Sequence, residues 1–256
     1  MKFVKMNGLG NDFVVFKGPL AIEPKVIAKL CDRHFGIGAD GLLIVSAGDV
    51  IKMDYWNADG TQAEMCGNGL RCVTRFAVDN KMAAPGDFRV QTPNEILKVS
   101  WDGNDEKSVS GQVGKVIIEP EPISLKGYDF HKASVGNPHA ITFVDDVSTA
   151  PVTALGPEIE TDQHFPNKTN VEFVQVESRG KINLRIWERG VGETMACGTG
   201  MVSTAMVCQN LDKTDFPTTL QVPGGSAEAW VDDEGYACLK GPAVYSFVGE
   251  IDLENL

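Results

Sequence analysis

The sequence lacks the long apolar runs of a membrane protein and the basic blocks of a protein that binds nucleic acid. No apolar run approaches the roughly 18 residues that span a bilayer, and the N-terminus MKFVKMNGLG has no hydrophobic signal region. With Lys+Arg 23 against Asp+Glu 35, the 256 residues carry a formal net charge of −12, which disfavours polyanionic partners. We therefore expect a soluble, cytoplasmic protein that binds neither nucleic acid nor a membrane.

Metal-binding spacings are also missing. The four histidines form no HxxxH pair and the six cysteines form no CxxC pair, so the sequence predicts no metal site. The chain shows no export signal and is long enough to bury a core, so we expect reduced thiols and no disulfides. Hydrophobic residues at 43% and charged residues at 23% are typical of a folded globular protein. Most of the cysteines should then be small buried hydrophobes.

Two cysteines differ from the others in their local sequence. Cys66 lies in EMCGNGLRC and Cys197 lies in MACGTGMVS, and each is followed by Gly-x-Gly and then by a helical apolar pattern. Such a pattern places the thiol at a helix N-terminus, where unpaired N–H groups and the helix dipole favour a thiolate.

The two cysteine segments belong to an internal repeat. Residues 57–69 (NADGTQAEMCGNG) align with residues 188–200 (ERGVGETMACGTG) at an offset of 131, and GNDF at 10–13 aligns with GNPH at 136–139 at an offset of 126. The similar offsets and the common order predict a duplication into two homologous α/β domains of roughly 120 residues each.

The remaining organisation is coarser. Short strand patterns bounded by Gly, Pro, Asn or Asp run through both halves, and a helix should begin at Pro24 and run to about His34. The polar stretch 101–111 marks a domain boundary. GIGADG at 36–41 matches a dinucleotide-binding pattern, but a helical pattern precedes it and a strand pattern follows it. Because a dinucleotide site needs the opposite order, we interpret it as a helix-to-strand turn.

Two thiols on opposite sides of one carbon can invert a stereocentre. One thiolate removes the proton from one face, and the other thiol delivers a proton to the opposite face. Backbone N–H groups at the two helix starts could hold the substrate carboxylate; they belong to Gly67, Asn68, Gly198 and Thr199. Two other functions stay open at this point. A Cys66–Cys197 disulfide could serve a redox role, and the glycine loops could bind a carboxylate without chemistry.

Four motifs in order resemble the diaminopimelate epimerase family of cofactor-independent amino-acid racemases. They are KMNGLGNDFVV, NADGTQAEMCGNGLRC, GNPH and ERGVGETMACGTG. The resemblance implies an α/β (α+β type) fold with two pseudo-symmetric domains, each a mixed β-sheet wrapped around a central helix, and an active site in the cleft between them. It implies an N-terminal domain of residues 1–112, to which 245–256 return, and a C-terminal domain of residues 113–244.

The resemblance also implies a reaction and a site. The reaction is the interconversion of LL- and meso-2,6-diaminopimelate, in lysine and peptidoglycan precursor synthesis, without pyridoxal phosphate or another cofactor. The substrate is an amino acid with two carboxylates, and a homodimer is possible by analogy. Carried over by motif, Cys66 and Cys197 are the catalytic pair, while His139 and Glu188 tune the thiol pKa values. The substrate-binding residues are Asn11, Asn57, Gly67, Asn68, Asn137, Asn170, Glu188, Arg189, Gly198 and Thr199.

This chain departs from the family pattern near the substrate, with Asn7 where many relatives have histidine and Gly41 where some have glutamine. Related two-cysteine racemases, the proline racemase-like enzymes, are the alternative within this architecture. Their flanking motifs fit this sequence less well.

Overall fold

A computed structural model describes residues 1–63 and 65–253 of the chain. The chain divides into two compact units. The first is residues 1–111 together with the C-terminal segment from residue 240, and the second is residues 112–239. No helix in the described residues is long and apolar enough to cross a membrane.

The first unit is built on a mixed sheet in the spatial order β18-β1-β2-β3-β4-β5-β6. Its strands are β1 (Lys2–Gly8), β2 (Asn11–Lys17), β3 (Gly41–Ser46), β4 (Ile51–Asn57), β5 (Gly86–Gln91), β6 (Ile96–Trp101) and β18 (Val244–Glu250). The pairs β2–β3 and β4–β5 are parallel, and the other neighbours are antiparallel. Strand β7 (Val109–Gly114) continues from β6 and crosses into the second unit.

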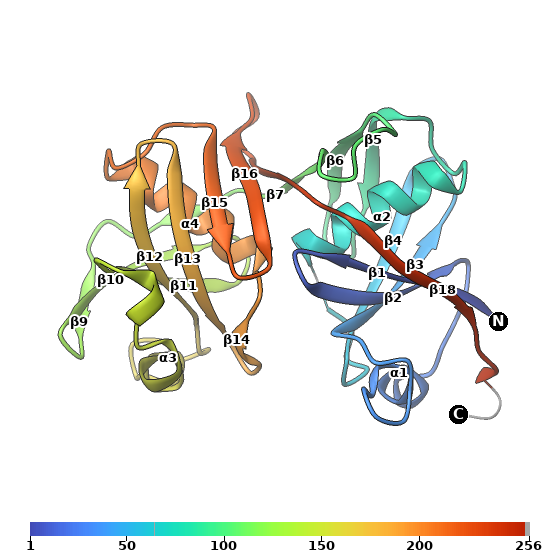
Figure 1. Ribbon diagram of the computed structural model, residues 1–256, viewed down its shortest axis with the longest axis horizontal. Coiled ribbons are helices and arrows are strands. Elements are labelled where there is room, and N and C mark those ends of the chain that lie inside the picture. The colour runs from blue at the N-terminus through green and yellow to red at the C-terminus, as the bar shows by residue number, and fades with distance from the viewer. Residues whose placement is uncertain (64, 254–256) are drawn as a thin grey trace. The chain divides into compact units, whose positions relative to one another are not determined.

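Helix α2 (Gly67–Asp79) lies inside the curve of this sheet (Figure 1). It contacts β1 near one end of the sheet, β6 at the other, and β2, β3 and β4 in the middle. Because the sheet surrounds it, even its polar residues Asn68, Arg71 and Thr74 are buried. Helix α1 (Pro24–Cys31) covers the opposite face of the sheet, where it packs Ile27 and Leu30 into a second apolar core. Both faces of the sheet are therefore buried.

The second unit has the same plan. Its strands are β8 (Ile117–Ile118), β9 (Ile123–Leu125), β10 (Tyr128–Ser134), β11 (Pro138–Phe143), β12 (Asn170–Ser178), β13 (Lys181–Glu188), β14 (Gly192–Thr194), β15 (Thr218–Val222), β16 (Gly225–Val231) and β17 (Ala237–Gly241). The main sheet runs β10-β11-β12-β13-β15-β16. Helix α4 (Gly198–Asn210) lies against this sheet and contacts β10, β11, β12, β15 and β16.

The other face of the second sheet is covered by α3 (Val152–Glu160), which follows the short 3-10 helix η1 (Val147–Thr149). Val152 and Ile159 of α3 pack with Phe130 and Phe173 of the sheet in an apolar core. Helix α3 thus has the same role in the second unit as α1 has in the first.

The order of strand pairings repeats between the units. In the first unit, the pairs from β1–β2 to β5–β6 are antiparallel, parallel, antiparallel, parallel and antiparallel. The pairs from β10–β11 to β15–β16 follow the identical series. Helices α2 and α4 occupy the same place in each series, before the strand that forms the second parallel pair. This confirms the prediction of a duplicated α/β fold with a central helix in each half.

Two helices differ from the sequence prediction. The first helix ends at Cys31 and does not reach His34. The cause is Asp32, whose carboxylate accepts hydrogen bonds from the backbone N–H groups of His34 and Phe35 and so starts a turn. Helix α3 has no counterpart among the helices predicted from sequence. Its Pro151-Val-Thr-Ala-Leu-Gly-Pro157 sequence carries two prolines, and proline usually marks a break.

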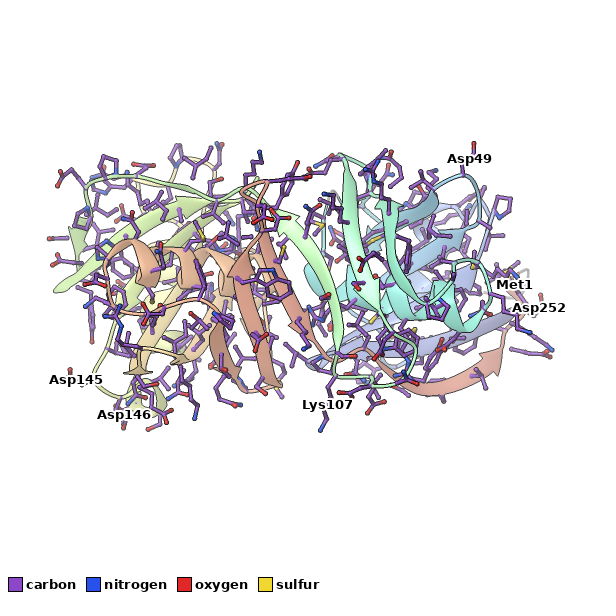
Figure 2. All side chains as sticks on the ribbon, turned by 90° about the horizontal axis from the view of Figure 1, so that it is seen from above. Met1, Asp49, Lys107, Asp145, Asp146 and Asp252 are labelled. Carbon is purple, nitrogen blue, oxygen red and sulfur yellow. The ribbon has the colours of Figure 1, made fainter. Side chains whose placement is uncertain are left out.

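Charged side chains project outward from both units (Figure 2). Asp49, Lys107, Asp145 and Asp146 are exposed examples. The excess of acidic residues noted in the composition thus includes solvated surface carboxylates.

Candidate active site

Cys66 is the N-cap of α2, as its sequence motif predicts. Its extended backbone (φ −148°, ψ 107°) turns the chain into the helix, and its sulfur accepts a hydrogen bond from the backbone N–H of Gly69 at 3.3 Å. The thiol also contacts Asn11, with 3.5 Å between Sγ and the side-chain oxygen Oδ1. The side chain is half-buried, which leaves part of it open to solvent.

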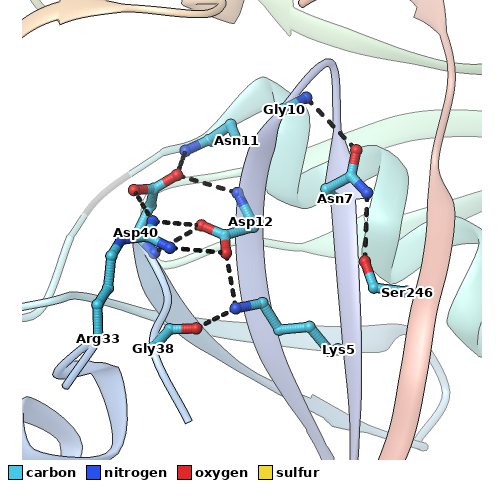
Figure 3. Close-up of polar contacts among 9 residues, drawn as sticks. All are labelled: Lys5, Asn7, Gly10, Asn11, Asp12, Arg33, Gly38, Asp40 and Ser246. Carbon is cyan, nitrogen blue, oxygen red and sulfur yellow. Dashed lines mark hydrogen bonds and ion pairs between the residues drawn. The ribbon is translucent and has the colours of Figure 1, made fainter. Parts of the chain in front are cut away.

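A polar network holds Asn11 in place (Figure 3). Asn11 donates through Nδ2 to Asp40 Oδ2 at 3.0 Å, and Asp40 Oδ1 accepts from Arg33 at 2.8 Å. Arg33 also binds both carboxylate oxygens of Asp12, which pairs with the buried Lys5 ammonium at 2.6 Å. Burial alone would raise the pKa of Asp12, but hydrogen bonds from Arg33 and Lys5 outweigh it and lower that pKa strongly.

Arg71 lies one turn further along α2 and is fully buried. Its guanidinium donates to Asn68 Oδ1 at 2.6 Å, to the Gly67 carbonyl at 3.3 Å and to the Pro242 carbonyl at 3.2 Å. All three acceptors are neutral, and within the described part of the chain Arg71 forms no ion pair. Burial lowers its pKa to about 10. No sequence motif marks this residue, because an arginine in a helix is ordinarily a surface residue.

Other residues of the first unit have local structural partners. Asn57 ends β4, where Nδ2 donates to Thr61 Oγ1 at 3.1 Å and Oδ1 accepts from the Tyr55 hydroxyl at 3.2 Å. Asn7 contacts Ser246 of β18 and the backbone N–H of Gly10 (Figure 3). A Cβ at Gly41 would lie 2.5 Å from the Trp56 carbonyl oxygen, so the backbone here leaves no room for a larger side chain.

Cys197 is the N-cap of α4, in the place equivalent to Cys66, but its surroundings are different. It is only 6% exposed, and Glu188 and Glu172 lie near it. Burial and then the charge of Glu188 raise the pKa of the Cys197 thiol well above its usual value. Burial likewise raises the pKa of Glu188, whose Oε1 accepts from the Thr194 hydroxyl at 2.6 Å.

A continuous line of hydrogen bonds reaches Cys197, whose thiol also has a hydrogen bond with Glu188. Its sulfur lies 3.3 Å from the Thr199 hydroxyl, which accepts from Asn137 Nδ2 at 3.2 Å. Asn137 Oδ1 faces His139 Nε2 at 3.2 Å, and His139 Nδ1 lies 2.7 Å from Glu172 Oε1. The sequence-selected residues Asn137, His139 and Thr199 are therefore brought together. Glu172 was missed, although a carboxylate inside the apolar strand pattern NVEFV is a usable signal.

Asn170 and Arg189 are neighbours on the second unit. Asn170 Nδ2 donates to the Pro138 carbonyl, and its Oδ1 accepts from the backbone N–H of Arg189, each at 2.9 Å. Asn170 thus holds the turn that carries Arg189. The Arg189 side chain is exposed, donates to the Asn167 carbonyl at 3.0 Å and forms no ion pair in the described residues.

The other four cysteines are buried, and none of the six is in a disulfide. Burial raises the pKa of Cys31, Cys72 and Cys208 to about 12, so these thiols stay protonated. No cluster of three or more His, Cys, Asp or Glu side chains suited to a metal occurs among residues 1–63 and 65–253.

Comparison with known proteins gives a consistent result. The model of the family described as diaminopimelate epimerase matches residues 3–118 and again 132–246. A diaminopimelate epimerase of Halorhodospira halophila is 41% identical over 99% of this chain and 96% of its own length. One of Methanococcus maripaludis is 38% identical over 99% of this chain and all of its own length.

Solved structures with the same fold share much less sequence. A PhzF-family phenazine biosynthesis protein of Bacillus anthracis has a TM-score of 0.78 at 14% identity, covering 98% of this chain and 99% of its own. A hydroxyproline epimerase of Agrobacterium vitis, with bound trans-4-hydroxy-L-proline, has a TM-score of 0.74 at 13% identity. The match covers 98% of this chain and 90% of the epimerase. These likenesses confirm the α/β fold over the whole chain.

Proposed function

This chain belongs to the diaminopimelate epimerase family, and from this premise we propose how it interconverts LL- and meso-2,6-diaminopimelate. As an isomerase of this family, it acts without changing the composition of its substrate. Cys66 and Cys197 carry the reaction, one on each face of a single α-carbon, and no cofactor takes part.

One observation carries the mechanism. Each of two equivalent helices begins at a cysteine, and in each unit the thiol has a polar partner that the repeat aligns. Cys66 contacts Asn11 directly, while Cys197 is joined to Asn137 through Thr199. A binding module would need the helix N-termini but not a thiol at both.

The proton moves in two steps. A cysteine thiolate removes the α-proton, and the electron pair of the C–H bond passes into the substrate carboxylate as an enediolate. The thiol of the other cysteine then gives its proton to the opposite face and is left as a thiolate. The reverse reaction exchanges the two roles. Burial and the charge of Glu188 favour the protonated form of Cys197, which suits the role of proton donor.

The substrate carboxylates need positive groups in an acidic protein. The backbone N–H groups at the starts of α2 and α4, from Gly67, Asn68, Gly198 and Thr199, suit the carboxylate on the reacting carbon. The exposed Arg189 guanidinium suits the distal carboxylate, since it has no anionic partner in the described residues. Asn11, Asn57, Asn137, Asn170, Glu188 and His139 stay predictions as substrate-binding or pKa-tuning residues.

The test is α-proton exchange. The reduced protein is incubated in D₂O with LL-diaminopimelate, without pyridoxal phosphate, and both the loss of the α-proton signal and the appearance of the meso isomer are followed. A parallel incubation with proline tests the proline racemase-like alternative. We expect exchange and inversion of diaminopimelate only. No deuterium uptake from diaminopimelate would refute the proposal.

Variants at single cysteines test the two-thiol step. Cys66→Ala and Cys197→Ala should each reduce epimerisation by at least about 10²-fold, because each face needs its own proton carrier. Cys208→Ala is the matched control, since Cys208 is buried in the same helix as Cys197 and lies at its other end. A redox protein would not turn over diaminopimelate at all when reduced, which separates that function from this one.

A cytoplasmic location, a role in lysine and peptidoglycan precursor synthesis and a homodimer are part of the same proposal. Cell fractionation tests the location. The growth requirement of a deletion strain tests the pathway, and the mass of the protein in solution tests the homodimer.

A further inference from the structure

Glu172 lies at the far end of the hydrogen-bond line that reaches Cys197, and nothing in the reaction requires it to touch the substrate. Its side chain and that of His139 are both fully buried, with 2.7 Å between Oε1 and Nδ1. The second carboxylate oxygen, Oε2, has no hydrogen-bond partner. Glycine at position 200 leaves space for this carboxylate, because a Cβ there would lie 2.5 Å from Glu172 Oε1.

The direction of the hydrogen bonds follows from the Asn137 side-chain amide. An amide nitrogen only donates and an amide oxygen only accepts. Since Asn137 Nδ2 donates to Thr199 Oγ1, its Oδ1 must accept from His139 Nε2. His139 therefore carries a proton on Nε2. The Thr199 hydroxyl, which accepts from Asn137, has its own proton left for the sulfur of Cys197, 3.3 Å away.

The contact between His139 and Glu172 must then contain a second proton. With Nε2 protonated, a hydrogen bond between Nδ1 and Oε1 requires a proton on one of those two atoms. The pair is an imidazolium with a carboxylate or an imidazole with a carboxylic acid. Both forms have zero net charge, so the buried Glu172 places no net negative charge beside Cys197.

We propose that Glu172 is a positioning residue that makes Thr199 a hydrogen-bond donor to Cys197. It does so by keeping His139 Nε2 protonated, which fixes the orientation of Asn137 and thereby that of the Thr199 hydroxyl. A donor to the sulfur stabilises the thiolate that Cys197 must become in each turnover. The inference rests on the proposed function, because only that function gives the ionisation of Cys197 a purpose.

If the Glu172–His139 pair lacked this second proton, every hydrogen bond from His139 to Cys197 would run in the opposite direction. His139 Nε2 becomes an acceptor, Asn137 turns over to donate to it, and Asn137 Oδ1 then takes the Thr199 hydroxyl proton. Thr199 can now only accept from the Cys197 thiol, which stabilises the protonated sulfur. With a proton on the Glu172–His139 pair, Thr199 is therefore the donor to the sulfur, and without it Cys197 is the donor.

If Glu172 acted only by its negative charge, its removal would have the opposite effect on Cys197 and would favour the thiolate. Cys197 faces Glu188 and Glu172, and the Glu172–His139 pair in turn faces Glu188. An uncompensated Glu172 carboxylate would hold the Cys197 thiol protonated, and its removal would favour the thiolate. In our proposal the pair is neutral, so its removal takes away only the ordering of Thr199.

The first experiment is ¹⁵N NMR of the whole protein with labelled histidine, from pH 6 to 9. His139 is assigned by its absence in His139→Asn. We expect protonated Nε2, with Nδ1 also sharing a proton, in the wild type. In Glu172→Gln only one ring nitrogen should hold a proton, because an amide cannot share a second one. An unprotonated Nε2 in the wild type would overturn the proposal.

The second experiment measures the pH at which Cys197 becomes half-maximally reactive toward iodoacetamide, by mass spectrometry of digested protein. Thr199→Val should raise this midpoint by roughly one unit, as expected for loss of one hydrogen bond to a charged group. Thr199→Ser should leave it unchanged. Cys66, modified in the same samples, serves as the internal control.

Glu172→Gln gives the discriminating result in the same assay. A midpoint that rises supports the proposal. A midpoint that is unchanged shows that Glu172 does not order Thr199, one that falls shows simple charge repulsion, and either result overturns the proposal. Glu177→Gln, on the exposed end of the same strand, is the matched control. If Glu172→Gln does not fold, the wild-type NMR spectrum and the Thr199 variants still decide the matter. Neither measurement needs turnover, so failure of the epimerase assay would remain a separate result.

Discussion

At the scale of single residues, the two cysteines have equivalent positions and unequal environments. Cys66 is half-buried beside the neutral Asn11, while Cys197 is buried beside Glu188. The fold places each thiol at a helix N-terminus, which favours a thiolate. In the second unit, burial and the charge of Glu188 oppose that effect. The duplicated motif therefore leaves one thiol half-buried and the other buried beside a carboxylate.

Glu188→Gln should make Cys197 reactive at lower pH. The charge of Glu188 raises the pKa of the Cys197 thiol, so removing that charge moves the midpoint of iodoacetamide modification down by roughly one pH unit. The amide oxygen can still accept from Thr194. Cys66, measured in the same digests, should not move. A midpoint that is unchanged would show that Glu188 is already neutral throughout the titration.

Gly69 and Gly200 occupy the same position in the two helices and should respond differently to alanine. A Cβ at Gly200 meets Glu172 Oε1 at 2.5 Å, whereas at Gly69 the nearest atom is the terminal methyl of the Met53 side chain at 3.3 Å. We expect Gly200→Ala to lower the free energy of unfolding by roughly 1–3 kcal/mol through overpacking. Gly69→Ala should change it by less than about 1 kcal/mol, because the helix propensity of alanine offsets a slight contact. Urea denaturation of both variants checks this.

At the scale of elements, the network of Lys5, Asp12, Arg33 and Asp40 ties the β1–β2 hairpin to the loop that follows α1 (Figure 3). That loop enters β3, and β3 is the parallel partner of β2. Asn11, the first residue of β2, is held toward Cys66 by the same network. A structural ion-pair network and a site residue thus share Asp40.

The network should make the first unit sensitive to acid. The pKa of Asp12 is lowered in the folded state from an ordinary value of 3.8, so its contribution is present above that value and is lost as the pH falls below it. Asp12→Asn should lower the unfolding free energy by roughly 3 kcal/mol at pH 7, because it leaves the buried Lys5 unpaired.

Urea denaturation of wild type and variant at pH 7 and below pH 4 measures this. The difference between the two proteins should shrink as the pH falls. Asp49→Asn, at an exposed position, is the control. A difference that stays constant with pH would contradict the assignment.

At the scale of the whole molecule, the chain ends in the unit where it begins. Strand β18 pairs with β1 from Lys2 to Asn7 (Figure 1). The carbonyls of Pro242 and Ala243 accept from Arg71 and Arg75 of α2. The C-terminal segment therefore completes both the sheet and the burial of the central helix in the first unit.

A chain that ends at residue 239 should have an unstable first unit. It loses the β1 partner strand and leaves the buried Arg71 without one of its acceptors, which should cost at least about 3 kcal/mol in total. Limited proteolysis should then cleave residues 1–111 before residues 112–239. A chain that ends at residue 250 keeps β18 and is the control. Equal protease resistance of both truncated chains would contradict this prediction.

Much of the fold was predictable because its signals are local. Cysteine before Gly-x-Gly, followed by helical apolar spacing, placed Cys66 and Cys197 at helix starts, and the repeated motifs predicted the duplication that the strand pairings confirm. The end of α1 was wrong by about three residues, because a side chain-to-backbone turn at Asp32 overrode the apolar pattern. Helix α3 was missed because its prolines resemble breaks.

The neighbours of the site residues were not predictable in the same way. Asp40, Arg71 and Glu172 reach the cysteine helices from other parts of the sequence or through burial, and no short motif marks them. The roles of Asn57 and Asn170 in catalysis stay predictions. In the structure, Asn57 holds a turn through Thr61, and Asn170 bridges the Pro138 carbonyl and the backbone N–H of Arg189.

The sequence by itself determined the family, the duplicated α/β fold and the two thiols, because each depends on short motifs whose geometry is set within one helical turn. Tertiary structure alone decided how the two thiols differ. Strand β12 brings Glu172 beside His139 and α4, and loop packing brings Arg33 and Asp40 beside Asn11. Electrostatic interactions act through space across buried, weakly screened distances. The ionisation of a catalytic group therefore depends on residues that are far from it in the chain.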